Sequence, residues 1–200
     1  MRRMCTLCGW TQAEQGAGRT LAIASAQSGE GKTSLAVAFA IMMAQDHASD
    51  VLLIECDLLR PTIARDFGLV SDTGLTQLLE GQSSRALRSR IPNLWLLPAG
   101  EPVDNPSRLL RSPRMSALLE EARSRYAFVI LDLPAVLDTS DAAVLARQTD
   151  GMVLVVRSGR TDTRAVQQAL QVLSGANLHG VVLNRSRTAT PDFIRRLFQL

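Results

Sequence analysis

Lysine is almost absent from this sequence of 200 residues, because Lys32 is the single lysine among 22 lysines and arginines. The formal net charge is +3, and a mildly basic surface is compatible with nucleic acid or anionic lipid as a partner. An arginine-biased composition is the simpler explanation of that charge. Aromatic residues make up only 4% of the chain and form no base-stacking motif, so we expect no nucleic-acid partner.

Long apolar runs and a secretory leader are also missing. No stretch reaches the roughly 18–20 apolar residues that span a bilayer. The start MRRMCTLCGW is too short and too polar for a signal peptide, so we expect a cytoplasmic protein. Of the three cysteines, Cys5 and Cys8 form one CxxC, but a zinc site needs about four ligands and the sequence has no second pair. This favours reduced cysteines in an N-terminal tail over a metal or redox site.

Short apolar runs alternate with helical patterns along the chain. Runs this uniformly apolar are typical of strands covered on both faces of a parallel sheet. Their alternation with amphipathic stretches predicts a doubly wound, mainly parallel α/β fold. The expected strands are 20–26, 51–55, 93–100, 128–133, 151–156 and 180–184, and the clearest expected helices are 34–45, 114–126 and 163–175. Ligands bind beyond the carboxyl ends of the strands in such folds, so the residues after each run are the candidates for function.

A glycine-rich loop follows the first expected strand and leads into a helix. Residues 26–34 read AQSGEGKTS, which matches the phosphate-loop pattern GxxxxGK[ST] except that Ala26 replaces the first glycine. The glycines let several backbone N–H groups converge on one anion, and the helix adds its positive end. A compact ammonium reaches phosphate oxygens where a forked guanidinium is bulkier, which explains a lysine at this one position. The expected phosphate-binding residues are Ser28, Gly29, Glu30, Gly31, Lys32, Thr33 and Ser34.

Three carboxylates lie at the ends of two other expected strands. Glu55 and Asp57 are two residues apart and share one side of an extended chain, while Asp132 directly follows the apolar run FVIL. We expect Asp132 to hold Mg²⁺ together with the hydroxyl of Thr33. Asp57 is either a general base toward an attacking hydroxyl or water, or a second metal ligand, and the sequence leaves both open. Glu55 is a further candidate metal ligand, or a solvated strand end.

These motifs together resemble those of the bacterial tyrosine kinases of capsular and exopolysaccharide biosynthesis, which are P-loop NTPases of the MinD/ParA-like superfamily. The matching segments include SGEGKTS, LLIECDLLRP and VILDLPAVLDTSDA, and the similarity runs from about residue 20 to residue 186. The resemblance implies binding of ATP and Mg²⁺ and phosphoryl transfer to protein tyrosine, and that Asn184 meets the adenine ring. It implies catalytic roles for Lys32, Asp57 and Asp132, and metal contacts for Thr33, Glu55, Asp57 and Asp132.

Several family features are changed or missing. Ser28 stands where the family usually has proline, Glu55 is one methylene longer than the usual aspartate, and Leu59 replaces a basic residue. Residues 1–19 contain no ExxRxxR segment of the kind that drives ring assembly, and the final residues TATPDFIRRLFQL contain no tyrosine. The single tyrosine, Tyr126, precedes a strand, where packing is the more common role. We therefore expect the phosphorylated tyrosine to lie on another protein.

The resemblance also implies a partner, the cytoplasmic tail of a transmembrane regulator of polysaccharide chain length. Contact with the membrane would then be peripheral, and the chain could also form a homo-oligomer. The expected organisation is a tail over 1–19, a P-loop domain over 20–188 and an amphipathic C-terminal helix over 189–200. Packing of that helix on the sheet is a simpler expectation than membrane binding. The alternative function is a MinD/ParA-like ATPase switch without kinase activity, although Gln27 occupies the position of the lysine typical of those switches.

Overall fold

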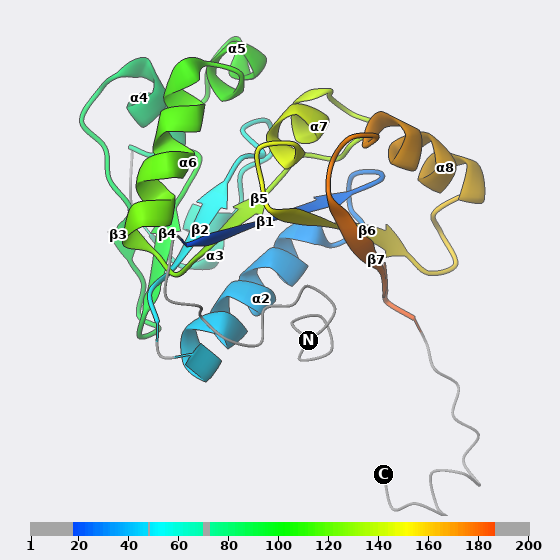
Figure 1. The fold of residues 1–200 in the computed structure, drawn as a ribbon, viewed down its shortest axis with the longest axis horizontal. Helices are drawn as coiled ribbons and strands as arrows, with labels where there is room; N and C mark the ends of the chain where they lie inside the picture. Colours follow the sequence, from blue (N-terminus) through cyan, green and yellow to red (C-terminus); the bar gives the residue numbers. More distant parts are fainter. Residues whose placement is uncertain (1–17, 48, 70–72, 187–200) are drawn as a thin grey trace, which may run out of the picture.

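The computed structural model describes residues 18–47, 49–69 and 73–186, which form a seven-stranded sheet in the order β3-β4-β2-β5-β1-β6-β7 (Figure 1). The strands are β1 Arg19–Ser25, β2 Val51–Glu55, β3 Leu87–Arg88, β4 Leu94–Leu97, β5 Phe128–Asp132, β6 Gly151–Arg157 and β7 Leu178–Asn184. The short β3 pairs antiparallel with β4, and the other neighbouring strands pair in parallel. β1 therefore lies inside the sheet, between β5 and β6.

Helices cover both faces of this sheet. They are α2 Lys32–His47, α3 Ile63–Asp66, α4 Leu75–Glu80, α5 Pro106–Leu110, α6 Pro113–Arg125, α7 Asp141–Ala146 and α8 Thr163–Val172. Figure 1 shows α2 on one face, with α6, α7 and α8 on the other. The two buried clusters follow the same division, because Phe39 of α2 belongs to one and Leu119 of α6 to the other. The prediction of a doubly wound α/β fold is confirmed.

All six strands expected from the sequence are present, and so are the three expected helices. The expected strand over 93–100 ends early, because Pro98 and Ala99 turn away from the sheet. The carbonyl of Pro98 accepts a hydrogen bond from Leu75 N, and Ala99 N donates to the carboxylate of Glu55. The elements that the sequence pattern did not reveal are β3, α3, α4, α5 and α7, none longer than six residues. Segments this short show too little periodicity to be recognised.

Two predicted segments lie outside the described residues. These are residues 1–17 of the predicted N-terminal tail, with Cys5 and Cys8, and the C-terminal helix over 189–200, whereas Arg19 already begins β1. The proposed domain boundaries therefore stay predictions. Within the described ranges, no helix combines the length and the apolar character needed to cross a bilayer.

The register of the parallel strands brings the polar candidates to one edge of the sheet. Asp132 of β5 is paired with Ile23 of β1 on one side and with Glu55 of β2 on the other. The loop that follows β1 therefore begins next to both carboxylates. The end of β7 and the segment after β6 meet the same loop from the opposite side, since Asn184 and Thr161 both donate hydrogen bonds to Glu30.

Leu53 and Leu59 provide a matched test of this core. Leu53 is fully buried in β2, whereas Leu59 is 64% exposed. We expect Leu53→Ala to lower the free energy of unfolding by about 3 kcal/mol, because the lost transfer energy and the cavity add. Leu59→Ala should change it by less than about 0.5 kcal/mol. Urea unfolding followed by circular dichroism measures both values, and equal losses would contradict the buried position of β2.

Candidate nucleotide-binding and phosphoryl-transfer site

The glycine-rich loop joins the end of β1 to the first turn of α2. Gly29 and Gly31 have φ angles of 81° and 94°, a left-handed conformation that other residues adopt only with strain. Gly31 is also constrained by space, since a Cβ there would lie 2.3 Å from Nδ2 of Asn184. The loop therefore turns sharply just before the N-terminus of α2, a position where backbone N–H groups bind anions favourably.

Asn184 closes this loop from the end of β7. Its Nδ2 donates to the carbonyl of Glu30 at 2.8 Å, and its Oδ1 accepts a hydrogen bond from Arg185 N at 2.8 Å. The sequence resemblance placed Asn184 at the adenine ring. In the structure its amide contacts the phosphate loop, and the adenine contact stays a prediction.

Glu30 fastens the loop to the segment after β6. It is almost fully buried, its Oε2 accepts from Gln27 N at 2.9 Å, and its Oε1 accepts from the Thr161 hydroxyl. The same Thr161 hydroxyl accepts a hydrogen bond from Arg157 N. Sequence reasoning missed Thr161, although its position just after a buried strand was the available signal.

Lys32 and Asp57 form a buried ion pair. The Nζ atom of Lys32 lies 2.7 Å from Oδ2 of Asp57, and their side chains are only 11% and 8% exposed. The same Nζ is 3.5 Å from the hydroxyl oxygen of Thr33. The second oxygen of Asp57 accepts a hydrogen bond from Arg60 N. Three residues predicted separately from two motifs therefore meet at one place.

Asp132 lies at the end of β5, and its buried carboxylate has the hydroxyl of Thr33 and the ammonium of Lys32 as neighbours. It is 0% exposed, and among the described residues neither of its oxygens accepts a hydrogen bond of ordinary geometry. Burial raises the pKa of Asp132 from 3.8 to about 7, even though the charge of Lys32 and a hydrogen bond from Thr33 act in the opposite direction. A buried carboxylate without hydrogen bonds of ordinary geometry is costly. It is therefore poised to bind a proton or a cation.

Glu55 was expected to be a metal ligand or a solvated strand end, but in the structure it is buried and accepts hydrogen bonds from backbone N–H groups. Its Oε1 accepts hydrogen bonds from the backbone N–H groups of Thr62 and Ile63, the latter at 2.8 Å, and its Oε2 accepts from Ala99 N at 3.1 Å. These contacts join the loop after β2 to the segment after β4. Metal ligation by Glu55 stays a prediction, but its hydrogen bonds in the structure are those of a loop anchor.

Cys56, between Glu55 and Asp57, is a further buried group at this edge. Burial and then the nearby carboxylates, Asp132 first among them, raise the pKa of the Cys56 thiol well above its ordinary value. Its backbone N–H donates to the carbonyl of Asp132 at 2.9 Å. The thiol is therefore protonated and unreactive, and Cys56 helps to hold β2 and β5 together.

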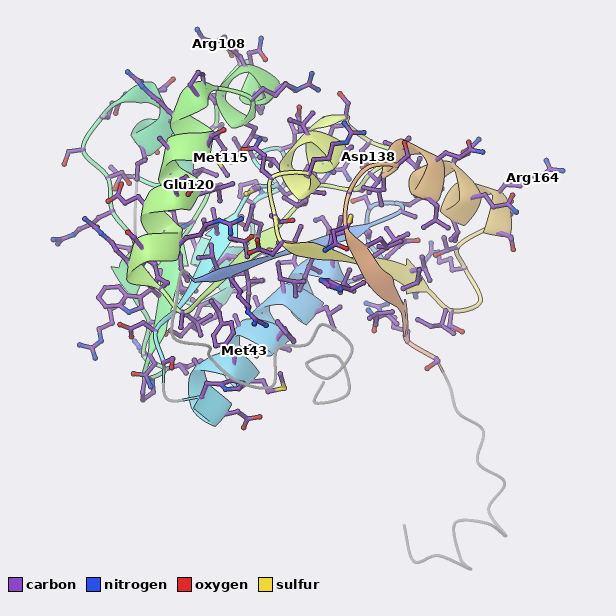
Figure 2. All side chains as sticks on the ribbon, viewed as in Figure 1. Met43, Arg108, Met115, Glu120, Asp138 and Arg164 are labelled. Carbon is purple, nitrogen blue, oxygen red and sulfur yellow. The ribbon has the colours of Figure 1, made fainter. Side chains whose placement is uncertain are left out.

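An exposed ion pair lies at the rim of the site. Nη1 of Arg60 is 3.2 Å from Oδ2 of Asp138, which Figure 2 shows in the connection between β5 and α7. Sequence reasoning did not single out either residue. Because both side chains are well exposed, the pair contributes little to stability, but it links the loop after β2 to the loop after β5.

Residues 21–197 match the family model described as the CobQ/CobB/MinD/ParA nucleotide binding domain. The chain is 36% identical over 171 residues to tyrosine-protein kinase YwqD of Bacillus subtilis, covering 83% of this chain and 72% of that protein. It is 34% identical over 176 residues to the succinoglycan biosynthesis transport protein ExoP of Rhizobium meliloti, covering 84% of this chain but 22% of ExoP. The crystal structure of the VpsO kinase domain superposes with a TM-score of 0.80 at 35% identity, covering 85% of this chain and 86% of that domain.

We expect Asp132→Asn to gain stability relative to the parent protein as the pH rises, in EDTA and without nucleotide. The folded carboxyl has a pKa near 7 against the ordinary 3.8, so the folded state binds the proton more tightly and its stability falls across this interval. The variant has no carboxyl group to titrate. Its free energy of unfolding should therefore rise relative to that of the parent by an amount on the order of 3 kcal/mol between pH 3.8 and about 7. Urea unfolding at several pH values measures the difference. The same trend in the exposed control Asp138→Asn would contradict the assignment to Asp132.

The loop-anchor role of Glu55 is tested by Glu55→Gln. An amide nitrogen cannot accept a backbone hydrogen bond, so we expect a loss of about 1–3 kcal/mol in the free energy of unfolding. Mg²⁺ affinity in the presence of nucleotide should not change. The control is Glu120→Gln, on the exposed side of α6 (Figure 2), and calorimetry and urea unfolding supply the two measurements. Unchanged stability together with weakened Mg²⁺ binding would restore the metal-ligand interpretation.

Proposed function

Because the chain belongs to the bacterial tyrosine kinases, within the CobQ/CobB/MinD/ParA nucleotide-binding family, we propose that it transfers the γ-phosphoryl group of Mg·ATP to a tyrosine hydroxyl of another protein. The observation that carries the proposal is the contact of 2.7 Å between Lys32 and Asp57, next to the buried carboxylate of Asp132. A phosphate-binding cation, a candidate base and a candidate metal ligand thus lie at the end of one glycine-rich loop.

Lys32 and Asp57 have to separate before the reaction. The ammonium of Lys32 is the group that neutralises the β- and γ-phosphate oxygens of ATP, and the incoming phosphates compete with Asp57 for it. Release of Lys32 leaves the carboxylate of Asp57 free to accept a proton. Asp57 then takes the proton of the attacking tyrosine hydroxyl, while backbone N–H groups of residues 29–34 hold the phosphates.

The residues around Asp132 fit a magnesium ion. Within the described residues, the two buried oxygens of Asp132 accept no hydrogen bond of ordinary geometry, and the hydroxyl of Thr33 lies close to them. No cluster of three or more acidic, histidine or cysteine side chains ready for a metal exists within the described residues. Mg²⁺ needs no such cluster, because it keeps several waters and binds one or two carboxylates together with substrate phosphates. When bound, it would neutralise charge on the transferred phosphoryl group.

Tyr126 is unsuited to be the acceptor within the same molecule. It follows α6 and precedes β5, so it lies at the amino end of the strand whose carboxyl end carries Asp132. Its ring packs edge-on against Trp95 with 6.2 Å between centroids. Burial also raises the pKa of Tyr126. These contacts support an acceptor tyrosine on a separate chain.

We infer that the separate chain includes the cytoplasmic tail of a transmembrane regulator of polysaccharide chain length. The similarity to ExoP, a succinoglycan biosynthesis transport protein of which this chain covers only 22%, supports a connection to polysaccharide export. Such a partner would bring the chain to the inner face of the membrane, and a homo-oligomer is compatible with it. The second candidate, an ATPase switch of the MinD/ParA kind, uses the same residues with water in place of tyrosine.

The test is incubation with γ-labelled ATP and Mg²⁺, with and without the tail of the candidate partner, while phosphotyrosine and free phosphate are both measured. We expect phosphotyrosine on the partner, reduced at least about a hundredfold by Lys32→Met and by Asp57→Asn. The matched control Asp66→Asn alters an exposed carboxylate of α3 and should retain activity. Free phosphate without phosphotyrosine would instead identify an ATPase switch.

A further inference from the structure

A cavity of about 230 Å³ lies between α6 and the strands β2 and β4. Its apolar wall includes Leu52 of β2, Leu97 of β4, and Leu118 and Ala122 of α6, all of them buried. Figure 1 shows α6 over this part of the sheet. An apolar cavity of about 150 Å³ is large enough to bind benzene, so a single ring or a short acyl chain fits in this one.

This cavity is separate from the nucleotide site. The described residues that line it include none from the glycine-rich loop and none of the carboxylates at the edge of the sheet. Tyr126, which does line it, precedes β5, whereas Asp132 ends that strand. Six residues of extended chain separate the two, a distance of about 20 Å. An occupant of the cavity would therefore leave the phosphate loop free for ATP.

Ser84 and Arg85 form a polar part of the cavity wall. The Oγ atom of Ser84 is buried and forms no hydrogen bond with any described residue. Buried hydroxyl groups nearly always have a partner, because an unpaired one keeps the full cost of losing its contact with water. The side chain of Arg85 is exposed, and no ion pair between described residues involves it. Two consecutive residues thus offer hydrogen-bond donors to an occupant.

The charge of the lining is positive on balance. Arg85 and Arg125 contribute two guanidinium groups, and Glu121 contributes one carboxylate. An oxygen of Glu121 lies 3.0 Å from Nη2 of Arg125, so that carboxylate already has a cationic partner. The ring of Tyr126 packs edge-on against Trp95, which holds this part of the wall in place. The cavity therefore combines an apolar interior with an uncompensated arginine.

We propose that this cavity binds a small anionic amphiphile. Its ring or short acyl chain lies among the leucines, and its carboxylate or phosphate group meets Arg85 and the hydroxyl of Ser84. A guanidinium group pairs with either anion through two parallel hydrogen bonds. The cavity is smaller than the roughly 300 Å³ at which sites for drug-sized ligands begin, so its ligand is a small one. This site does not depend on the proposed phosphoryl transfer, because it shares no residue with that centre.

Titration of the full chain with phenylacetate, followed by NMR of the backbone amides, tests the site. We expect saturable shifts of the signals from residues 84–86 and 118–126. Phenylacetamide, which has the same shape without the charge, and acetate, which lacks the ring, should each bind at least about tenfold more weakly. Arg85→Gln should weaken phenylacetate binding at least about fivefold, and Ser84→Ala about threefold. The matched control is Arg90→Gln, an exposed arginine of the same segment that is not part of the lining, and it should leave the affinity unchanged.

Filling the cavity provides an independent test. Ala122→Leu adds three carbon atoms to the wall and should abolish phenylacetate binding while ATP binding is retained. Ala86→Leu, at a partly buried position of the lining, serves the same purpose if the first variant does not fold. Phenylacetate binding that survives in the filled variant would overturn the proposal. So would equal affinities for phenylacetate and phenylacetamide, equal losses in the Arg85 and Arg90 variants, or shifts confined to residues 29–34. None of these measurements needs turnover, so failure of the kinase assay leaves them interpretable.

Discussion

Parallel pairing of β1 with β5 and β6 determines which chemical groups can meet in this protein. Side chains at the carboxyl ends of neighbouring parallel strands lie at one edge of the sheet, and the loop after β1 crosses that edge. Asp132 is held beside the loop by its register with Ile23 and Glu55. If β5 were shifted by one residue against its neighbours, the side chain of Asp132 would point to the opposite face of the sheet. An apolar residue of β5 or of the segment after it would then take its position.

Three charged side chains at this edge, those of Lys32, Asp57 and Asp132, are buried and have little contact with water. The ion pair of Lys32 and Asp57 balances one positive and one negative charge, and within the described residues the carboxylate of Asp132 has no ion-pair partner of its own. Burial of an isolated charge is expensive, so Asp132 holds a proton more readily than an exposed carboxyl. The site is therefore deficient in positive charge, and bound magnesium would correct this deficiency.

The main features of the fold and most members of the site could be predicted from the sequence. Buried strands such as 51–55 are continuous apolar runs, and the loop around Gly29 and Gly31 carries a recognisable spacing. Short elements such as α3 and α7 escaped prediction, because their helical form depends on tertiary contacts rather than on periodicity. The role of Glu55 also required the structure, since its backbone partners come from segments 7 and 44 residues away in the chain. The same holds for Thr161, which reaches Glu30 across 131 residues.

The contact between Lys32 and Asp57 has a consequence for the end of the proposed reaction as well as for its start. ATP and Asp57 compete for one ammonium group, and the outcome depends on how much negative charge the nucleotide presents. Once the γ-phosphoryl group has left, ADP offers less charge, and Asp57 regains Lys32 more easily. In the proposed reaction, the ion pair would therefore favour departure of ADP and return Lys32 and Asp57 to the contact seen in the structure.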